Sequence, residues 1–528
     1  MSTARYSTDL AGLLLRVGDE AIRATADLRA LVAFRAAAVR GRGRPVARAA
    51  LALIVLLTIA AAWFPAYLPG AAGSPPGQTR FTSGQAIVLL PSAYLGVLVI
   101  SIISAASSGG GRELLARDQG VAFPVSPTTD HLGALVMAPL NIAWLLQSWV
   151  VLGATAFVIG PHNHLLAAQV PVLIWLFVAT AVAQLVAWLV ELLRRVRHGV
   201  WVLRGVVVAL AGVAAAVIVA DDVVPLLDRS PTIGVILAAL HGSQGAWGPW
   251  MQSVIGLLAM ALTAVLLGAY VAHALARRVP RDELRVESSV HSRRVNPASD
   301  FVATLRIDRA GVWRSVPLRR GFTVLALLPG LVAVASALEW YMLNVLPGLV
   351  ASGGALLFGV NAWCLDGRGA LWRESLPVPP RLVFVTRVVV LLEVLLAAIV
   401  IALLLASLRA GTPTVAQVVA VLCSTLVVTF QVVSGSMRWS VRRPFAVDMR
   451  SARATPAPPL TMVGYSTRLA LATTFTGMLF VAASSVAWHW SVLLAVPFLA
   501  LSLLRLARTS AAWEQAETRS RVVTSVAS

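Results

Sequence analysis

The sequence predicts an all-α polytopic membrane protein with about 12 transmembrane helices, arranged as two parallel six-helix repeats. Hydrophobic residues make up 58% of the 528 residues, and the mean hydropathy is +0.81. Charged residues make up only 12%, against roughly 25% in soluble domains. The uncharged runs 49–68, 167–190 and 415–437 reach the roughly 20 residues that a helix needs to cross a bilayer. The chain is therefore not a disordered protein or a disulfide scaffold.

Apolar runs separated by polar loops predict the individual spans. They occupy residues 48–67, 84–106, 131–159, 167–192, 201–219, 252–275, 321–341, 346–364, 382–407, 414–435, 467–487 and 489–506. The expected domains are an amphipathic N-terminal helix, cytoplasmic or interfacial (1–47), a first six-helix half (48–276), a cytoplasmic linker with an interfacial helix (277–320), a second six-helix half (321–506) and a cytoplasmic tail (507–528).

The distribution of positive charge predicts the orientation. The net charge is +20, and all 43 basic residues are arginine. Forty of the 43 fall in or beside the termini and the even-numbered loops, and only Arg80, Arg229 and Arg409 fall on the other side. Cytoplasmic loops are enriched in arginine, so both termini are expected in the cytoplasm of a multi-pass protein of the plasma (inner) membrane. The positive-inside pattern thus accounts for the net positive charge. The expected partner of the chain is the lipid bilayer, and no nucleic-acid partner is expected.

The two halves share a segment between their second and third spans. Arg112–Asp118 is followed by Pro124–Pro127, and Arg368–Glu374 is followed by Pro377–Pro380. Each copy predicts a short charged helix that ends at a Pro-Val-x-Pro turn and leads into a long apolar helix. Because the copies hold the same place in each half, the halves have the same orientation and are related by an axis along the membrane normal.

An amphipathic helix is expected ahead of each half. Residues 8–40 place leucine and valine near one helical face and charged residues on the other. In the linker, Ser299–Arg306 opens like a helix with a serine N-cap. Helices of this kind lie in the membrane interface before the chain turns into a span.

No catalytic or metal-binding constellation stands out. Cys364 and Cys423 lie in apolar runs without metal-binding spacing, and His162 and His164 follow Pro161 in what we interpret as a solvated turn. A nucleotide-binding P-loop needs a lysine that reaches the phosphates, and the chain has no lysine. If ATP drives this protein, the ATPase is therefore a separate polypeptide.

A few polar residues fall inside predicted spans. Glu393 lies about 11 residues into the ninth span, roughly 16 Å from its start at 1.5 Å per residue, so we expect it near the midplane. An acid in that position indicates function, and Asn141 occupies a near-equivalent place in the first half. An alternative to a functional role is that Glu393 and Asn141 each form an interhelical hydrogen bond that only fixes the packing of the helices. The other buried polar candidates are Gln147, Gln184 and Gln431.

These features resemble permeases of the type-2 ABC exporter class, in the fused form that carries both six-helix halves in one chain. Drug- and ionophore-efflux permeases of high-GC Gram-positive bacteria are similar. The resemblance rests on the interfacial helix 8–40, the charged helices Arg112–Asp118 and Arg368–Glu374, and the outer segment Ala220–Pro249, which resembles the re-entrant outer helices of the class.

The resemblance implies a subunit that exports small hydrophobic or amphipathic molecules, such as drugs, ionophores or lipids. ATP and Mg would be held by a separate ATP-binding subunit in two copies, and no cofactor or metal by this chain. The loops after the second span of each half would dock on that subunit. The implied coupling residues are Arg112, Glu113, Arg117, Asp118, Arg368, Arg373 and Glu374. The polar span residues Asn141, Gln147, Gln184, Glu393 and Gln431 would line the substrate pathway.

Two other functions are compatible with the sequence. A proton-coupled secondary efflux transporter of the major facilitator type also has twelve spans and parallel halves, but its Gly-x-x-x-Asp-Arg loop after span two is missing here. A membrane-embedded glycosyltransferase would need clustered acids in outer loops, which only Asp221, Asp222 and Asp228 offer.

Overall fold

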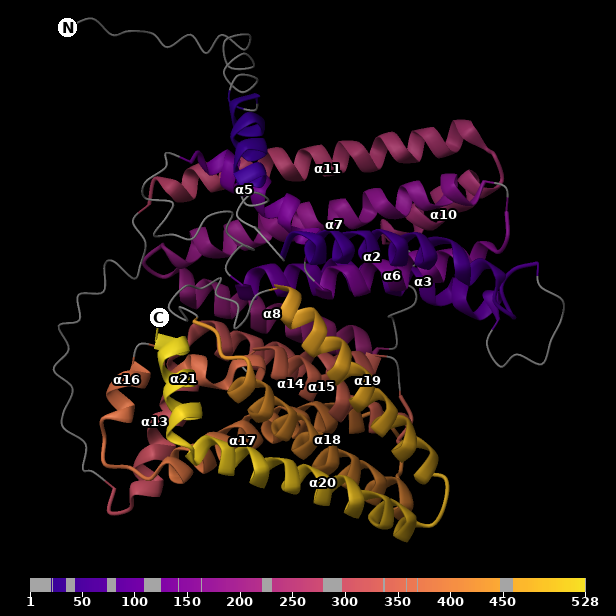
Figure 1. Ribbon diagram of the computed structural model, residues 1–528. Helices are drawn as coiled ribbons and strands as arrows, with labels where there is room; N and C mark the ends of the chain where they lie inside the picture. The colour runs from indigo at the N-terminus through magenta and orange to yellow at the C-terminus, as the bar shows by residue number, and fades with distance from the viewer. Residues whose placement is uncertain are drawn as a thin grey trace, which may run out of the picture. The chain divides into compact units, whose positions relative to one another are not determined.

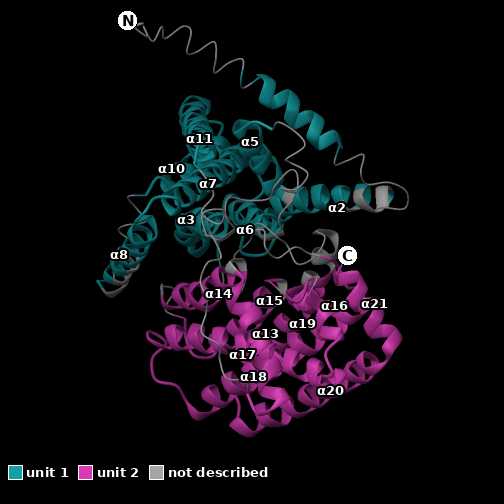
Figure 2. Cartoon of the chain, turned by 90° about the vertical axis from the view of Figure 1, so that its left-hand side faces the viewer, with its two compact units in different colours: residues 1–288 teal, residues 289–528 magenta. Residues whose placement is uncertain are grey.

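The chain divides into two compact helical units, residues 1–288 and 289–528 (Figure 2). The computed structural model describes residues 20, 22–34, 43–73, 82–108, 125–140, 142–162, 164–220, 230–278, 297–335, 338–357, 359–367, 369–446 and 459–527. Within these residues every regular element is a helix, as the sequence predicts (Figure 1). The division between the units falls inside the predicted linker 277–320.

The first helix described in unit 1 covers residues 22–34. The further elements of this unit are α2 (Gly43–Trp63), η1 (Phe64–Tyr67), α3 (Ser83–Ser108), α5 (Pro127–Met137), η2 (Ala138–Leu140), α6 (Ile142–Ile159), α7 (Leu165–Arg194), α8 (Gly199–Val219), α10 (Thr232–Ser243) and α11 (Trp247–Ala276).

Helix α7 is the centre of unit 1, because it packs against α3, α10 and α11. Its Trp175 is buried and donates an indole hydrogen bond to the carbonyl oxygen of Tyr94 in α3 at 3.0 Å. Helix α10 approaches α7 closely at Gly242, where a Cβ atom would lie 2.8 Å from the carbonyl oxygen of Ala167. A larger residue at 242 would therefore push these two helices apart.

Unit 2 contains the second set of helices. They are α13 (Asp300–Arg314), α14 (Val316–Ala335), η3 (Met342–Val345), α15 (Leu346–Leu357), η4 (Gly359–Leu365), α16 (Gly369–Glu374), α17 (Pro380–Ser407), α18 (Val415–Arg442), α19 (Pro459–Ala483), α20 (Trp488–Glu514) and α21 (Ala516–Ala527).

Helices α17 and α18 form the core of unit 2. Helix α17 packs against α13, α14, α15, α18 and α20, and α18 packs against α15, α19 and α20. A capping box opens α18, because the Thr414 hydroxyl accepts from the amide of Gln417 at 3.3 Å while the Gln417 side chain accepts from the amide of Thr414 at 2.9 Å. The close approach of α14 to α17 uses Gly330, whose Cβ atom would lie 2.6 Å from the carbonyl oxygen of Ala402.

Helices occupy each of the twelve predicted span ranges, but their lengths and breaks differ from the prediction. Six described helices (α3, α7, α11, α17, α18 and α20) are long and apolar enough to cross a membrane, and the number rises to eight if each of two bent pairs is one span. The bent pairs are α13 with α14, at 80°, and η3–α15 with η4, at 43°. The chain is thus a helical membrane protein with six to eight candidate spans among the described residues; the arrangement of twelve in two repeats stays a prediction.

The differences from the expected ranges include two breaks and one added helix. The range 131–159 is not one helix, because α5 gives way to the 3₁₀ turn η2 before α6 begins. The range 346–364 is interrupted between α15 and η4, and Asn361 has a non-helical backbone there. The described tail, residues 507–527, is helical on both sides of Gln515, since α20 continues to Glu514 and the amphipathic helix α21 (Ala516–Ala527) follows it.

Candidate functional site

The short helix α16 is the predicted charged segment of the second half. It follows a turn at Gly367, whose φ of 48° lies in the left-handed region that suits glycine. It ends before the run 375–380, and Pro380 then opens α17 at a position where proline is tolerated because the first-turn amides have no helical partner. The prolines restrict the backbone of this turn, so α16 is joined to α17 by a stiff connection.

Four charged side chains from different elements meet beside α16. Asp308 comes from α13, Asp366 from the turn before α16, Arg373 from α16 and Arg387 from α17. The Arg373 Nη1 atom lies 2.7 Å from Asp308 Oδ1 and 3.1 Å from Asp366 Oδ1. The Arg387 Nη2 atom lies 3.0 Å from Asp308 Oδ1 and 2.8 Å from Asp366 Oδ1. We call these four residues the charged cluster.

The charged cluster is balanced and buried. The side chains of Arg387 and Asp308 are 0% and 1% exposed, and two positive charges face two negative ones. Burial raises the pKa of the Asp308 carboxyl, but the guanidinium groups of Arg387 and Arg373 outweigh that effect, so its pKa lies below the ordinary value. Because buried charges are costly without partners, the cluster fixes the positions of all the elements that supply them.

Aromatic rings extend the cluster toward the C-terminus. The guanidinium carbon of Arg387 lies 5.1 Å from the centre of the Trp363 ring. Trp363 in turn stacks on Trp513 of α20, with ring centroids 4.0 Å apart and an interplanar angle of 4°. The Trp513 indole donates to the carbonyl oxygen of Pro380 at 3.1 Å. The end of α20 is therefore attached to the first residue of α17.

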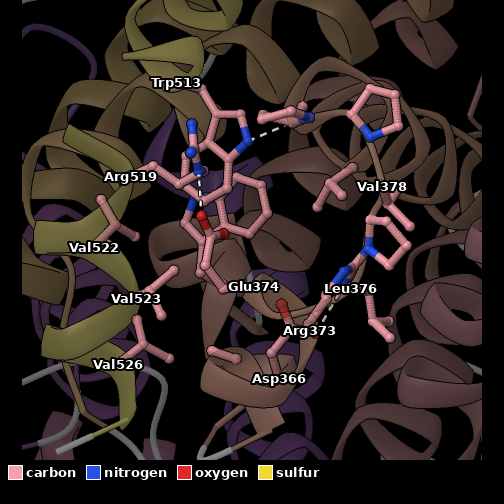
Figure 3. Close-up of a pocket in the computed structure, with 16 residues that line it drawn as sticks. Asp366, Arg373, Glu374, Leu376, Val378, Trp513, Arg519, Val522, Val523 and Val526 are labelled. Carbon is pink, nitrogen blue, oxygen red and sulfur yellow. Dashed lines mark hydrogen bonds and ion pairs between the residues drawn. The ribbon is translucent and has the colours of Figure 1, made fainter. Parts of the chain in front are cut away.

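The C-terminal helix α21 lies beside α16 (Figure 1). Arg519 of α21 donates through Nε to Glu374 Oε1 of α16 at 2.5 Å. A partly open cavity of about 340 Å³ lies between α16, the turn that follows it and α21, and Trp363 and Trp513 also line it. Figure 3 shows valines of α21 on one side of this cavity, among them Val523, and Leu376 and Val378 of the turn on the other.

The structure describes only part of the predicted coupling residues. Arg112, Glu113, Arg117 and Asp118 of the first copy and Arg368 of the second lie outside the described residues. Arg373 directs its guanidinium into the charged cluster, and Glu374 pairs with Arg519. The outer face of α16 instead carries Leu371 and Trp372, which are 55% and 65% exposed.

The predicted pathway residues are divided between the two units, and their joint role in a pathway stays a prediction. Asn141 lies outside the described residues, Gln147 is half-buried and Gln184 is buried in unit 1. In unit 2, Gln431 accepts a hydrogen bond from the Thr476 hydroxyl at 3.1 Å.

Glu393 differs from the isolated span residue that the sequence suggests. Its carboxylate accepts a hydrogen bond from Arg309 Nε of α13 at 2.8 Å, and its side chain is 39% exposed within the unit. Two neighbouring residues of α13 therefore bind α17, because Asp308 holds Arg387 and Arg309 holds Glu393. This explains why Arg387 and Glu393, which point to different sides of α17, are not partners of each other.

The charged cluster itself was not predicted, although two signals point to it. Thr304, Leu305, Asp308 and Val312 form the buried stripe of α13, so Asp308 is an acid at an apolar position of an amphipathic helix. Arg387 is an arginine inside a predicted span, where a charge needs a partner. Neither signal shows that Asp308 and Arg387 are partners, because 79 residues separate them in the chain.

A second polar contact attaches the N-terminal segment within unit 1. Glu20 Oε1 lies 2.6 Å from Nε2 of His273 at the end of α11 and accepts from the Thr128 hydroxyl of α5 at 2.8 Å. The hydrogen bond from Thr128 and the nearby His273 hold the pKa of Glu20 below its ordinary value, against the effect of burial. The segment ahead of the spans is thus attached to α5 and α11.

Comparison with protein-family models, with curated protein sequences and with solved structures gives no match. Within the described residues, no group of three or more His, Cys, Asp or Glu side chains is placed to hold a metal ion. The class that the fold defines is a helical membrane protein; its function is argued below from the charged cluster and α16.

Proposed function

We propose that this chain is the transmembrane permease subunit of an ATP-driven exporter of hydrophobic or amphipathic molecules, with a separate ATPase bound on its cytoplasmic side. The observation that carries the proposal is the charged cluster. It connects the short helix α16 to the interfacial helix α13 and to the long apolar helix α17 through Asp308, Asp366, Arg373 and Arg387.

This arrangement suits the transmission of force. A partner that displaces α16 would move Arg373, and with it both carboxylates and Arg387. Separating these charges would leave an unpaired charge in a buried site, at a cost of several kcal/mol, so α13 and α17 follow α16. The proline-rich turn adds a second, stiff connection from α16 to α17.

The contact with the ATPase is best assigned to the exposed apolar residues of α16. Leu371 and Trp372 are adjacent and more than half exposed, on a segment that the arginine pattern places outside the bilayer. A tryptophan that no lipid covers is typical of a protein interface, where it often contributes much of the binding energy. We propose that Trp372 enters an apolar pocket of the ATPase while Arg373 holds α16 in place from behind.

The remaining parts of the proposal are those that the resemblance to permeases of the type-2 ABC exporter class implies. Both termini lie in the cytoplasm of a plasma-membrane protein, two copies of the ATPase bind ATP and Mg, and each copy contacts one of the two charged helices. Arg112–Asp118 would be the first of these helices and α16 the second. The substrate is a small hydrophobic molecule that passes between apolar walls carrying isolated polar groups.

The test is co-purification of a candidate ATPase subunit from the same organism with variants of α16, read alongside substrate export. Trp372→Ala should lower association about tenfold or more, as expected for a central aromatic contact. The matched control is Trp490→Ala, which removes another exposed tryptophan (54%, against 65% for Trp372) at the predicted outer end of α20 and should leave association unchanged. If Trp372→Ala combined with Leu371→Ala retains full association and export, α16 is not the docking helix.

A further inference from the structure

We propose that five arginines at the predicted inner ends of α18, α19 and α20 form a binding site for the phosphate of an anionic membrane lipid. We call this set the arginine patch; its members are Arg438, Arg442, Arg468, Arg505 and Arg508. The patch contains no residue of α16 or of the charged cluster, and binding there needs neither an ATPase nor a transported substrate. The inference therefore does not depend on the proposed export function.

The fold brings the patch together from distant parts of the chain. Helix α18 packs against both α19 and α20, while Figure 1 shows α19 and α20 diverging from the turn that joins them. Arg438 and Arg442 lie one turn apart at the end of α18, and Arg505 and Arg508 lie one turn apart on α20. The positive charges of the other four members all repel Arg438, that of Arg442 most strongly, so Arg438 lies at the centre of the patch.

The patch carries positive charge that the described residues do not neutralise. All five side chains are exposed, and none forms an ion pair with an acid in the part of the chain that the structure describes. In the sequence, residues 438–468 contain six arginines and a single acid, Asp448, which lies outside the described residues. One carboxylate would leave most of the patch unbalanced. The positive-inside rule explains arginines in this loop, but it does not require them to converge with those of α20.

Phosphate is the anion that this arrangement suits. A guanidinium group offers paired N–H donors that match two phosphate oxygens, and it stays charged at physiological pH. An anion beside Arg438 would be attracted by charges from three helices and would relieve the repulsion among them. Basic sites between transmembrane helices on the cytoplasmic side bind anionic lipid headgroups in this way.

The surface next to the patch favours a lipid over a soluble anion or an acidic protein. On α19, Leu471 and Phe475 follow Arg468 at helical spacing and are exposed, and on α20 the exposed Leu501 lies one turn before Arg505. Phe475 is seven residues from Arg468, roughly 10 Å along the helix, which is within the roughly 15 Å hydrocarbon depth of one leaflet. A lipid can therefore place its phosphate on the patch and its acyl chains on α19 and α20.

Mass spectrometry of the intact protein released from detergent tests the site, because it counts the lipids that stay bound. The purified full chain is mixed with equal amounts of phosphatidylglycerol and phosphatidylcholine that carry the same acyl chains. We expect phosphatidylglycerol to be retained about tenfold better, because it alone of the two has a net negative charge, and its binding should saturate. Glycerol 3-phosphate, which has the phosphate without the chains, should not displace the lipid at the same concentration.

Variants of the patch locate the binding. Arg438→Gln combined with Arg505→Gln removes the central charge and one from α20, and should raise the half-saturating concentration of phosphatidylglycerol about tenfold or more. The matched control Arg204→Gln removes an exposed arginine near the start of α8 in unit 1 and should leave that concentration unchanged. Without lipid, the double variant should unfold at no lower temperature than the parent protein, because it loses repulsion and no described ion pair.

Four results would overturn the proposal. The first is equal retention of the two lipids, and the second is equal binding by the double variant and the Arg204→Gln control. The third is displacement of the lipid by glycerol 3-phosphate, which would make the patch a site for a soluble phosphate. The fourth is a lower unfolding temperature of the lipid-free double variant, which would show that these arginines stabilise the fold through partners of their own.

Discussion

At the scale of single residues, Arg387 of α17 is a charged group in a fully buried environment. Its side chain is fully buried, and among the described residues its charge is balanced by Asp308 and Asp366, which also bind Arg373. Removing one charge from such a set leaves another uncompensated, which is far more costly than losing an exposed ion pair. The cluster therefore behaves as one unit, and its members should show strong coupling in mutation experiments.

We expect Asp308→Asn and Arg387→Met each to destabilise the protein by about 3–5 kcal/mol, which lowers the midpoint of thermal unfolding on the order of 10 °C. The double variant leaves one Arg and one Asp facing each other, so its loss should be clearly smaller than the sum of the single losses. Tryptophan fluorescence during heating in detergent measures the midpoints.

The exposed pair Arg309–Glu393 is the control, and Arg309→Met should cost about 1 kcal/mol or less. Additive losses in the cluster would show that its four charges do not act together.

The lowered pKa of Asp308 predicts the direction of a pH effect. An aspartate whose folded pKa lies below its unfolded value of about 3.9 stabilises the fold above that value, and the stabilisation is lost as the pH falls through the folded pKa. Thermal unfolding should therefore shift to lower temperature between pH 5 and the most acidic pH that the detergent tolerates. Asp308→Asn cannot be protonated there, so its unfolding temperature should fall less over the same range. Parallel curves for the two proteins would contradict this role of Asp308.

The sequence indicated these residues only in part. The repeated charged segment pointed to Arg373 and Glu374, but the structure shows Arg373 turned inward, a direction that depends on Asp308, 65 residues earlier. Charge spacing along a short helix cannot distinguish an arginine that faces a partner protein from one that faces an acid on another helix. Glu393 stands out in the sequence by its depth in a predicted span, but the sequence does not identify its partner Arg309, which lies 84 residues away.

At the scale of elements, the C-terminal helix α21 was not expected. The stretch 507–528 looks like a charged tail, yet Val522, Val523 and Val526 lie on one face at helical spacing and are buried. That short apolar stripe is the signal that could have predicted it. Periodicity over three residues is weak evidence, and the cause of its burial, the stacked pair Trp363 and Trp513 beside it, depends on distant parts of the chain.

Trp513 should be the residue that holds this C-terminal segment in place. Trp513→Ala removes the stack on Trp363 and the indole hydrogen bond to Pro380, and we expect a loss of about 3–5 kcal/mol. Hydrogen exchange of the amides in 516–527 should become faster, because α21 loses its support. Trp513→Phe, which keeps a ring, should cost less than half as much. Unchanged exchange in α21 after Trp513→Ala would mean that the valine face alone holds the helix.

At the scale of the whole molecule, composition alone predicted a helical membrane protein. Within the described residues every regular element is a helix, and six of the helices, or eight spans with the two bent pairs, are long and apolar enough to cross a membrane. The hydropathy of a segment depends only on its own residues, so it predicted helices correctly in all twelve expected ranges. It could not foresee that some ranges break, because a break at η2 or at Asn361 depends on how the neighbouring helices pack. The number of spans and the pairing of the two halves therefore remain predictions.

The orientation of the chain is the prediction that the arginine pattern makes most directly. Forty of 43 arginines lie on one predicted side, and crossing the membrane in the opposite sense would place them in outer loops, against the positive-inside rule.

In a background that lacks Cys364 and Cys423, single cysteines at Ser7, Ser292 and the exposed Ser520 should resist a membrane-impermeant thiol reagent in intact cells. A cysteine at the exposed Ser485, in the turn between α19 and α20, should react. After the cells are opened all four should react, which shows that each site is accessible. Labelling of Ser7, Ser292 or Ser520 from outside would place α16 on the wrong side of the membrane for an ATPase, and the proposed function would fail with it.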